Sequence, residues 1–312
     1  VQAKYREAEA FGHRIAAKLD DNHANMVAHY IIGAPLTWRG QFRDGREALA
    51  KGERFGDAHF AETAPNRRDL AGLAQIYAMR AVVEAYLGNG STALQYGAQG
   101  IDLAQKTGQP LTLANAVHMA CIAHQTLNHP DAMSMAQQLS DVSEACGYPF
   151  YTASTKCHLG GALLHKGVAS EGYKLLQEGW LHLEEIGTRA SAAYVRAELA
   201  RGCLMLGRLK DGLQHVSEGL AHAAAFDERN FEAELHRIRG QLLEASGAPS
   251  GEVRAAYANA VYCARTQGAA LFELRASMLL SAVSGAGEDP DLPNRLALLR
   301  DRLSEPIPSE HP

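Results

Sequence analysis

The chain has 312 residues, of which 46% are hydrophobic, and its 30 basic and 35 acidic residues give a formal net charge of −5. This apolar content supports a folded core and excludes a chain that is disordered throughout, while the lack of any run of 18 apolar residues argues against a transmembrane helix. The charges are spread along the chain without a basic block, which disfavours contact with nucleic acid or an anionic membrane.

The predicted elements are all helices, because no segment alternates apolar and polar residues over any length. In chain order, helices are expected over residues 1–19, 23–39 and 43–55, then 70–87 and 91–107, 110–127 and 130–146, 149–166 and 169–186, 189–206 and 209–226, 228–245 and 250–267, and finally 269–283 and 291–303. The first helix has no partner before it and is expected to be the second half of an incomplete repeat. The chain lacks an initiator methionine and a signal sequence, and we expect it to be part of a longer protein.

A repeat of about 40 residues organises these helices. Turn residues at Gly88, Asn128, Gly167, Gly207 and Gly247 follow one another at intervals of 40, 39, 40 and 40, and Gly40 precedes them. A second series ends the other helix of each pair, at Gly108, Gly147, Gly187, Asp227 and Gly268. Glycine and asparagine are typical of the position after a helix because they adopt the left-handed backbone conformation.

Small residues occupy two positions around these turns, at all six places of the first and four of the five places of the second. Seven residues before the turn stand Gly33, Ala81, Cys121, Gly160, Ala200 and Gly240, and five residues after it stand Gly45, Ala93, Met133, Gly172 and Gly212. Such columns let two helices approach closely, as in tetratricopeptide repeats. The sequence therefore predicts an all-α, tetratricopeptide-like right-handed superhelix of about six to seven antiparallel helix pairs over residues 1–283, followed by a capping helix and tail over residues 284–312.

One interval departs from the repeat, because 48 residues separate Gly40 from Gly88. The extra residues fall in Gly56–Asp69, which contains Pro65. This segment is predicted to be a long loop that ends with Asp69 as the cap of the next helix, and it is a second candidate surface for binding.

Several segments of the chain resemble the C-terminal repeat region of bacterial multidomain signalling proteins. Those proteins carry a class III adenylate/guanylate cyclase domain or a transcriptional regulator domain, fused to a signal-transduction ATPase of the STAND type. The matching segments are Leu36–Phe42, Gly147–Phe150, Phe231–Leu243, Gln267–Ala276 and Asp289–Leu292, and the resemblance covers about residues 10–303. It implies a cytoplasmic regulatory module that senses a partner or ligand and supplies no catalytic residues. The family usually has a further helix where this chain has only the segment 281–288, so the C-terminal cap is expected to differ.

Motifs for enzyme chemistry are absent from the sequence. It contains no phosphate-binding loop of the G-x-x-x-x-G-K-[ST] type and no H-E-x-x-H zinc motif. The five cysteines include no C-x-x-C pair, which indicates free thiols in a reducing compartment. His118 and His124 do not share a helix face, so no metal site is expected. We therefore expect no catalytic residue, no cofactor and no metal.

The concave groove is the predicted binding surface, since the first helix of each pair lines it in tetratricopeptide superhelices. Taking the register from the resemblance, the lining positions lie about 13, 10, 6, 3 and 2 residues before each turn. The candidate groove residues are Tyr30, Trp38, Gln75, Tyr86, Asn115, His118, Gln125, Tyr194, Arg201, Glu234 and Arg237. Aromatic and amide groups in the first half suit a peptide backbone or a small polar ligand, and the second half is charged. Burial between repeats is the competing interpretation of the aromatic residues.

Three functions are compatible with these features. The leading one is a non-catalytic binding and regulatory scaffold that takes a protein, a peptide or a small polar ligand in the groove. The alternative is a homo-oligomerisation scaffold without a ligand, in which the first helix exposes an apolar face. An enzyme is the least favoured, because no acid–base pair or nucleophile is evident.

Overall fold

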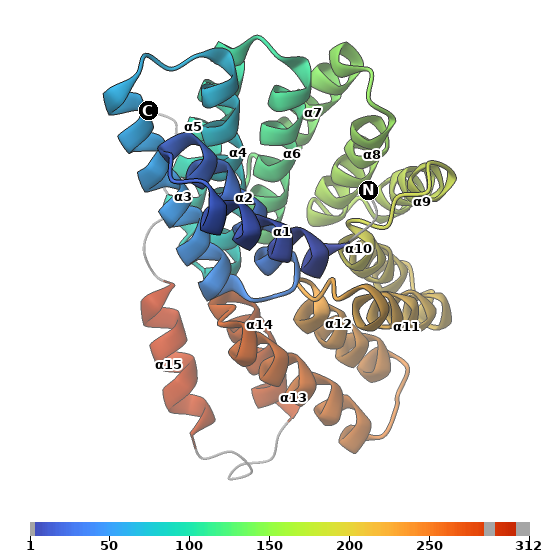
Figure 1. Ribbon diagram of the computed structural model, residues 1–312. Coiled ribbons are helices and arrows are strands. Elements are labelled where there is room, and N and C mark those ends of the chain that lie inside the picture. The colour runs from blue at the N-terminus through green and yellow to red at the C-terminus, as the bar shows by residue number, and fades with distance from the viewer. Residues whose placement is uncertain (1–3, 284–290, 304–312) are drawn as a thin grey trace, which may run out of the picture.

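The computed structural model describes residues 4–283 and 291–303, which form fifteen helices and no strand (Figure 1). In chain order the helices are α1 (Tyr5–Lys18), α2 (Asn22–Trp38), α3 (Phe42–Glu62), α4 (Arg67–Leu87), α5 (Gly90–Thr107), α6 (Pro110–Thr126), α7 (Ala132–Cys146), α8 (Pro149–His165), α9 (Ala169–Glu185), α10 (Ala192–Met205), α11 (Leu209–Phe226), α12 (Glu232–Ala245), α13 (Ser250–Gln267), α14 (Ala270–Val283) and α15 (Leu292–Arg302). This confirms the all-α prediction.

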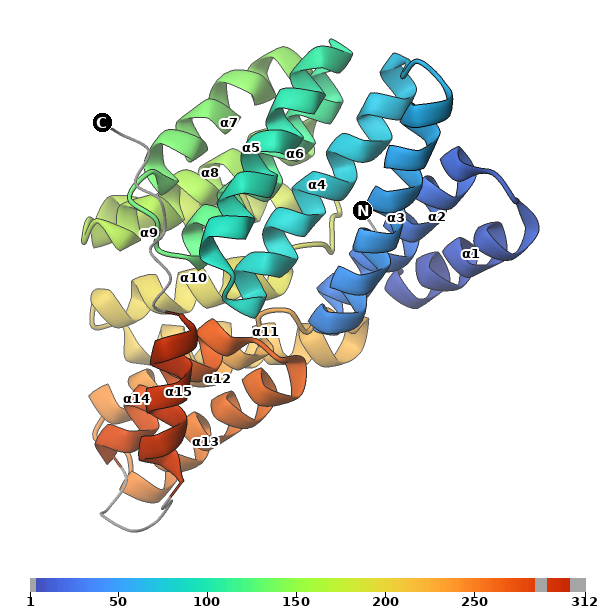
Figure 2. The same cartoon turned by 90° about the vertical axis from the view of Figure 1, so that its left-hand side faces the viewer.

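The helices pack as antiparallel pairs that follow one another around a superhelix (Figure 2). Each even-numbered helix from α2 to α14 packs against the odd-numbered helix after it, and each from α2 to α12 also packs against the next even-numbered helix. The even-numbered helices therefore form the inner layer and the odd-numbered helices the outer layer. Helix α1 packs against α2. None of the helices in the described part of the chain is long and apolar enough to cross a membrane.

The residues predicted to end the helices all adopt the left-handed backbone conformation. The φ angle is 87° at Gly88 and 80° at Gly167, and it is also positive at the two non-glycine positions of the series, with 54° at Asn128 and 58° at Asp227. At Gly88 the backbone N–H bonds to the carbonyl of Ala85, and the next N–H bonds to that of Glu84, which satisfies carbonyl groups that the helix end leaves free.

The small-residue columns mark the closest approach within a helix pair. A Cβ atom added at Gly160 would lie 2.6 Å from the carbonyl oxygen of Gly172, and one added at Gly172 would lie 2.8 Å from the carbonyl oxygen of Gly160. The backbones of α8 and α9 are therefore in direct contact at this point. The same arrangement joins Gly33 of α2 to Gly45 of α3.

The predicted loop over Gly56–Asp69 is wrong. Helix α3 continues to Glu62 and α4 begins at Arg67, so only four residues separate the helices and the longer interval comes from longer helices. Gly56 lies inside α3, in contact with the Met26 side chain. The cap of α4 is Asn66 rather than Asp69: Asn66 accepts from the backbone N–H of Asp69, and Asp69 accepts from that of Asn66, which is a capping box.

The two ends of the superhelix meet across its concave side. Helix α14 packs against α4, and in Figure 1 the blue N-terminal helices lie directly above the orange C-terminal ones. The ring of Tyr86 on α4 contacts the rings of Phe231 and Phe272, at centroid distances of 5.9 and 5.7 Å. The carbonyl of Trp38 accepts hydrogen bonds from the backbone N–H groups of Arg229 and Asn230. The superhelix is therefore closed rather than open.

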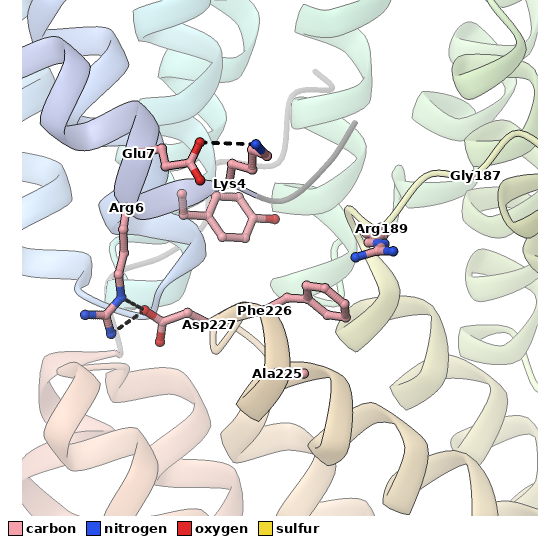
Figure 3. Close-up of a pocket in the computed structure, with 9 residues that line it drawn as sticks. Lys4, Arg6, Glu7, Gly187, Arg189, Ala225, Phe226 and Asp227 are labelled. Atoms are coloured by element: carbon pink, nitrogen blue, oxygen red, sulfur yellow. Dashed lines mark hydrogen bonds and ion pairs between the residues drawn. The ribbon is translucent and has the colours of Figure 1, made fainter.

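Ion pairs around Asp227 reinforce this contact, and Figure 3 shows the one with Arg6. The Asp227 carboxylate accepts from Arg6 of α1, from Arg39 after α2 and from Arg229 of its own loop, each at 2.9 Å. Burial alone would raise the pKa of Asp227, but the hydrogen bonds from these three arginines outweigh it and hold the pKa below its usual value. One carboxylate thus ties the first two helices to the loop between α11 and α12.

Candidate functional site

A cavity of about 260 Å³ lies on the concave side, and we call it the concave cavity. It is bounded by the even-numbered helices α6, α8, α10, α12 and α14 and by the residue before α12. Its lining residues are Gln125, Thr126, Asn128, His165, Tyr194, Ala197, Glu198, Arg201, Phe231, Glu234, Arg237, Ile238, Phe272 and Arg275. Five of the residues predicted to line the groove meet here: Gln125, Tyr194, Arg201, Glu234 and Arg237.

Glu234 and Arg237 form the most strongly paired part of the cavity wall. The Arg237 guanidinium donates from Nε to one Glu234 oxygen at 2.8 Å and from Nη2 to the other at 2.9 Å, a bidentate pair one helical turn apart. Burial raises the pKa of Glu234, but the charge and hydrogen bonds of Arg237, with the charges of Arg275 and Arg201, lower it below the usual value. Glu234 is therefore ionised at neutral pH.

Arg275 of α14 crosses the cavity to the opposite wall. Its Nη2 donates to the carbonyl of Thr126, at the end of α6, at 2.7 Å. Its Nη1 lies 3.9 Å from Glu234, whose two oxygens are already bonded to Arg237. Burial lowers the pKa of Arg275, and the positive charges of Arg237 and Arg201 lower it further, against the opposing charges of Glu234 and Glu198.

Arg201 and Glu198 pair on α10 at the third side of the cavity. Arg201 also donates to Nδ1 of His165 at 3.0 Å. Desolvation, with the positive charges of Arg201 and Arg275, lowers the pKa of His165, so this ring is neutral and accepts the hydrogen bond. Three guanidinium groups therefore face two carboxylates, which leaves one positive charge in excess.

A hydrogen-bonded network runs from Gln125 away from the cavity. The Gln125 amide donates to the carbonyl of His158 at 2.6 Å, and its oxygen accepts from Nδ1 of His158 at 2.7 Å and from the hydroxyl of Tyr194. Because His158 donates through Nδ1, its Nε2 accepts from Nδ1 of His118 at 3.0 Å. His118, His158 and Tyr194 are buried, so this network fixes the inner faces of α6, α8 and α10 against one another.

The remaining candidate groove residues do not share one surface. Tyr86 is fully buried, so the expectation that it lines a groove is wrong, because closure of the superhelix places it in the core. His118 is likewise buried, between repeats. Tyr30 and Trp38 are partly buried against the main core. Gln75 and Asn115 are half-buried on α4 and α6, and neither borders the concave cavity.

Important residues of the cavity were not predicted from the sequence. Arg275 escaped because the series of turns was ended at Gly247. Gly287 stands 40 residues further on, but Arg275 precedes it by 12 positions, which is not one of the lining positions that were counted. Its position within the matching segment Gln267–Ala276 was the only available signal. Phe231 and Phe272 became lining residues through closure, which no local pattern encodes.

The comparisons with known proteins concern the fold. No family model matches the sequence, and no curated protein matches it. A solved Rap protein complexed with Competence and Sporulation Factor has a TM-score of 0.70 at 11% identity, over 95% of this chain and 80% of that one. The Rap conjugation gene regulator of plasmid pLS20, in complex with a Phr peptide, has a TM-score of 0.61 at 13% identity, over 91% and 79%.

A third solved structure is a STAND-class ATPase with a tetratricopeptide repeat sensor from Pyrococcus horikoshii. Its TM-score is 0.51 at 14% identity, over 96% of this chain and 44% of that chain. This chain thus corresponds to less than half of that ATPase. Together with the paired helices, these likenesses define the class: the protein is a tetratricopeptide-like helical-repeat superhelix.

Proposed function

We propose that this chain is a non-catalytic regulatory region of a larger bacterial signalling protein, and that it binds a ligand carrying a carboxylate in the concave cavity. The observation that carries the proposal is the excess positive charge of the cavity wall. A buried charge that is only partly compensated is costly, and guanidinium groups match the planar geometry of a carboxylate. A ligand with one negative charge would balance Arg275.

The size of the cavity narrows the ligand class. At about 260 Å³ it lies just below the range of about 300–1,000 Å³ that is typical of sites for drug-sized molecules. It therefore suits a small polar acid or the C-terminal residue of a peptide rather than a whole peptide chain. A protein partner would enter through its terminal carboxylate.

The position of the cavity supports a regulatory role. The hydrogen bond from Arg275 to Thr126 joins α14 to α6, so a ligand that competes for Arg275 acts on a bond between the C-terminal helices and an earlier repeat. If open and closed forms differ in affinity for the ligand, binding shifts the population between them. A neighbouring domain would respond to this shift.

The signalling context rests on two supports. The first is the sequence resemblance to repeat regions that follow a cyclase or regulator domain and a STAND ATPase. The second is the likeness in fold to Rap proteins and to a STAND ATPase with a repeat sensor. A non-catalytic role is also supported by the cysteines, since burial raises the pKa of the Cys157 thiol to about 12 and also raises that of Cys121, which disfavours the nucleophilic thiolate.

A homo-oligomerisation scaffold is the second candidate, and α1 supplies the observation for it. Phe11 and Leu19 are 50% and 49% exposed on and just after this helix. A second copy would cover these side chains. This candidate requires no ligand in the concave cavity.

Native mass spectrometry of the chain tests the proposal directly. The probe is a mixed pool of short peptides, offered once with free C-terminal carboxylates and once as the C-terminal amides. We expect only the free acids to bind, and Arg275→Gln to weaken binding about tenfold or more, since hydrogen bonds to charged groups contribute about 1.5–3 kcal/mol. Lys174→Gln, on the exposed face of α9, is the matched control.

Three outcomes would overturn the proposal. Equal binding of acids and amides would show that the ligand is not recognised through its carboxylate. Unchanged binding by a folded Arg275→Gln variant would show that the ligand does not bind in the concave cavity. A concentration-dependent dimer that binds neither pool would favour the oligomerisation scaffold.

A further inference from the structure

We infer that His23, His59 and Asp69 form a binding site for a divalent transition metal of the Zn²⁺ type. The three side chains come from three helices: the first turn of α2, the last turn of α3 and the first turn of α4. One nitrogen from each histidine and one carboxylate oxygen all lie within 4.8 Å of one another. The site is separate from the concave cavity, so this inference does not rest on the proposed function.

The donor set is the first reason. Two imidazole nitrogens and one carboxylate oxygen are ligands that Zn²⁺ uses in three-residue sites that leave a fourth position open. With metal–ligand bonds of about 2.0–2.2 Å, ligand atoms around a tetrahedral ion stand roughly 3.3–3.5 Å apart. Nδ1 of His23 already lies 3.1 Å from Oδ1 of Asp69, and Nε2 of His59 lies 3.3 Å from Oδ2.

The second reason is how these atoms face one another. Nδ1 of His23 is buried yet makes no hydrogen bond, despite its closeness to the Asp69 carboxylate. A nitrogen and an oxygen at this distance without hydrogen-bond geometry are placed as two ligands of a shared ion would be. A bound cation would satisfy both atoms, whereas a buried ring nitrogen that makes no hydrogen bond is costly.

The third reason is that a backbone hydrogen bond fixes the orientation of the Asp69 carboxylate. Oδ2 of Asp69 accepts the backbone N–H of Asn66 at 3.1 Å, as part of the capping box of α4. Outer hydrogen bonds of this kind orient metal ligands. The Asp69 side chain is 5% exposed, while those of His23 and His59 are 25% and 18% exposed, so an ion reaches the site from the histidine side.

A second cluster shows why donor identity alone is insufficient. Glu232, His236 and Cys263 also converge between α12 and α13. Both oxygens of Glu232, however, accept from Arg229 at 3.2 Å, so the carboxylate already has a cationic partner. The ion pairs of Asp69 within the described residues are with His23 and His59 and with no arginine or lysine, so its carboxylate remains available.

The bound metal would fasten three helix ends together at the outer edge of the N-terminal repeats. The test uses the whole chain, freed of metal with a chelator and then titrated with Co²⁺, which reports its coordination through visible absorption bands. We expect one tight equivalent of Co²⁺, displaced by Zn²⁺, and a melting temperature that rises with free Zn²⁺.

Variants place the ion at these residues. His23→Gln and His59→Gln should each weaken Co²⁺ binding by more than about 100-fold, because losing a ligand costs more than losing an outer-sphere partner, which costs about 10–100-fold. His13→Gln is the control, since His13 is a histidine on α1 that is 63% exposed. His59→Cys should keep the metal and add a thiolate-to-cobalt charge-transfer band.

The inference is overturned by any of three results. These are a titration without visible bands, a single tight site that survives in folded His23→Gln and His59→Gln, and a His59→Cys variant that binds Co²⁺ without the charge-transfer band. Circular dichroism confirms that each variant is folded, so a loss of binding cannot be confused with a loss of structure.

Discussion

The hydroxyl of Tyr86 on α4 accepts a hydrogen bond of 3.1 Å from the side-chain amide of Asn230, which lies 144 residues further along the chain. Both residues are buried. This pair belongs to the contact through which the N-terminal and C-terminal repeats close the superhelix. A polar bond at the centre of an aromatic cluster sets the register between the two ends, because an unpaired amide there would be costly.

Replacing Tyr86 with phenylalanine tests this pair. The ring would still fill its place among Phe42, Phe231 and Phe272, but the amide of Asn230 would lose its acceptor. We expect the free energy of unfolding to fall by about 1–3 kcal/mol, measured by urea denaturation. Tyr262→Phe, at a residue that is 72% exposed, should change it by less than about 0.5 kcal/mol. Equal effects would show that the bond does not stabilise the closure.

Asp227→Asn tests the ion-paired edge of the closure. Asparagine tolerates the left-handed conformation found here, with φ of 58°, so the backbone is retained while Arg6, Arg39 and Arg229 lose their shared charge. We expect faster amide hydrogen exchange in α1, because Arg6 no longer anchors it. Asp141→Asn, on the exposed face of α7, should leave this exchange unchanged. Equal exchange rates in α1 of the two variants would show that Asp227 does not anchor this helix.

Gly160→Ala tests the close approach of α8 and α9. The new methyl group would lie 2.6 Å from the Gly172 carbonyl oxygen and 2.9 Å from the Leu176 nitrogen. We expect a loss of about 1–3 kcal/mol, measured by thermal or urea unfolding, since the backbones must separate. Gly251→Ala adds the same methyl group inside α13 where nothing lies within 4 Å. This control should gain stability of up to about 1 kcal/mol from helix propensity alone.

The buried histidines predict a pH dependence of stability. Burial lowers the pKa of His118 to about 4, and burial together with the neighbouring His118 lowers the pKa of His158 well below 6.5. The unfolded chain therefore binds more protons than the folded one between pH 6.5 and about 4. Stability that is fully present above pH 6.5 is lost as the pH falls through this window, by about 3 kcal/mol for His118 alone.

Urea unfolding at several pH values measures this slope. We expect His118→Gln to lower the slope between pH 6.5 and 4, and His13→Gln to leave it unchanged. A slope that is the same in wild type and His118→Gln would mean that His118 is not kept neutral by the fold.

The repeat architecture was predictable because the backbone conformation at each helix end restricts which residue types can stand there. Only glycine and a few polar residues adopt the left-handed conformation without strain, so Gly88, Asn128 and Asp227 marked their turns in the sequence. The error at Gly56 came from the same rule. A glycine inside α3 provides close contact with Met26, and sequence alone does not distinguish this use from a helix end.

The candidate site was only partly predictable. Repeat register placed Gln125, Tyr194 and Arg201 on the inner face, because the inner helices follow one period. Closure joins residues that are separated by more than a hundred positions and leaves no periodic signal. It moved Tyr86 into the core and brought Arg275 into the cavity. Likewise, His23, His59 and Asp69 meet only because α3 and α4 extend beyond the predicted ends.

Closure also changes how this protein is expected to unfold. In an open solenoid each repeat contacts only its neighbours, so stability is roughly a sum along the chain and the ends can fray independently. Here the carbonyl of Trp38 accepts hydrogen bonds from the backbone N–H groups of Arg229 and Asn230. The N-terminal and C-terminal repeats therefore stabilise each other directly. Loss of either end therefore removes a neighbour from the other, and the chain should melt in one cooperative step.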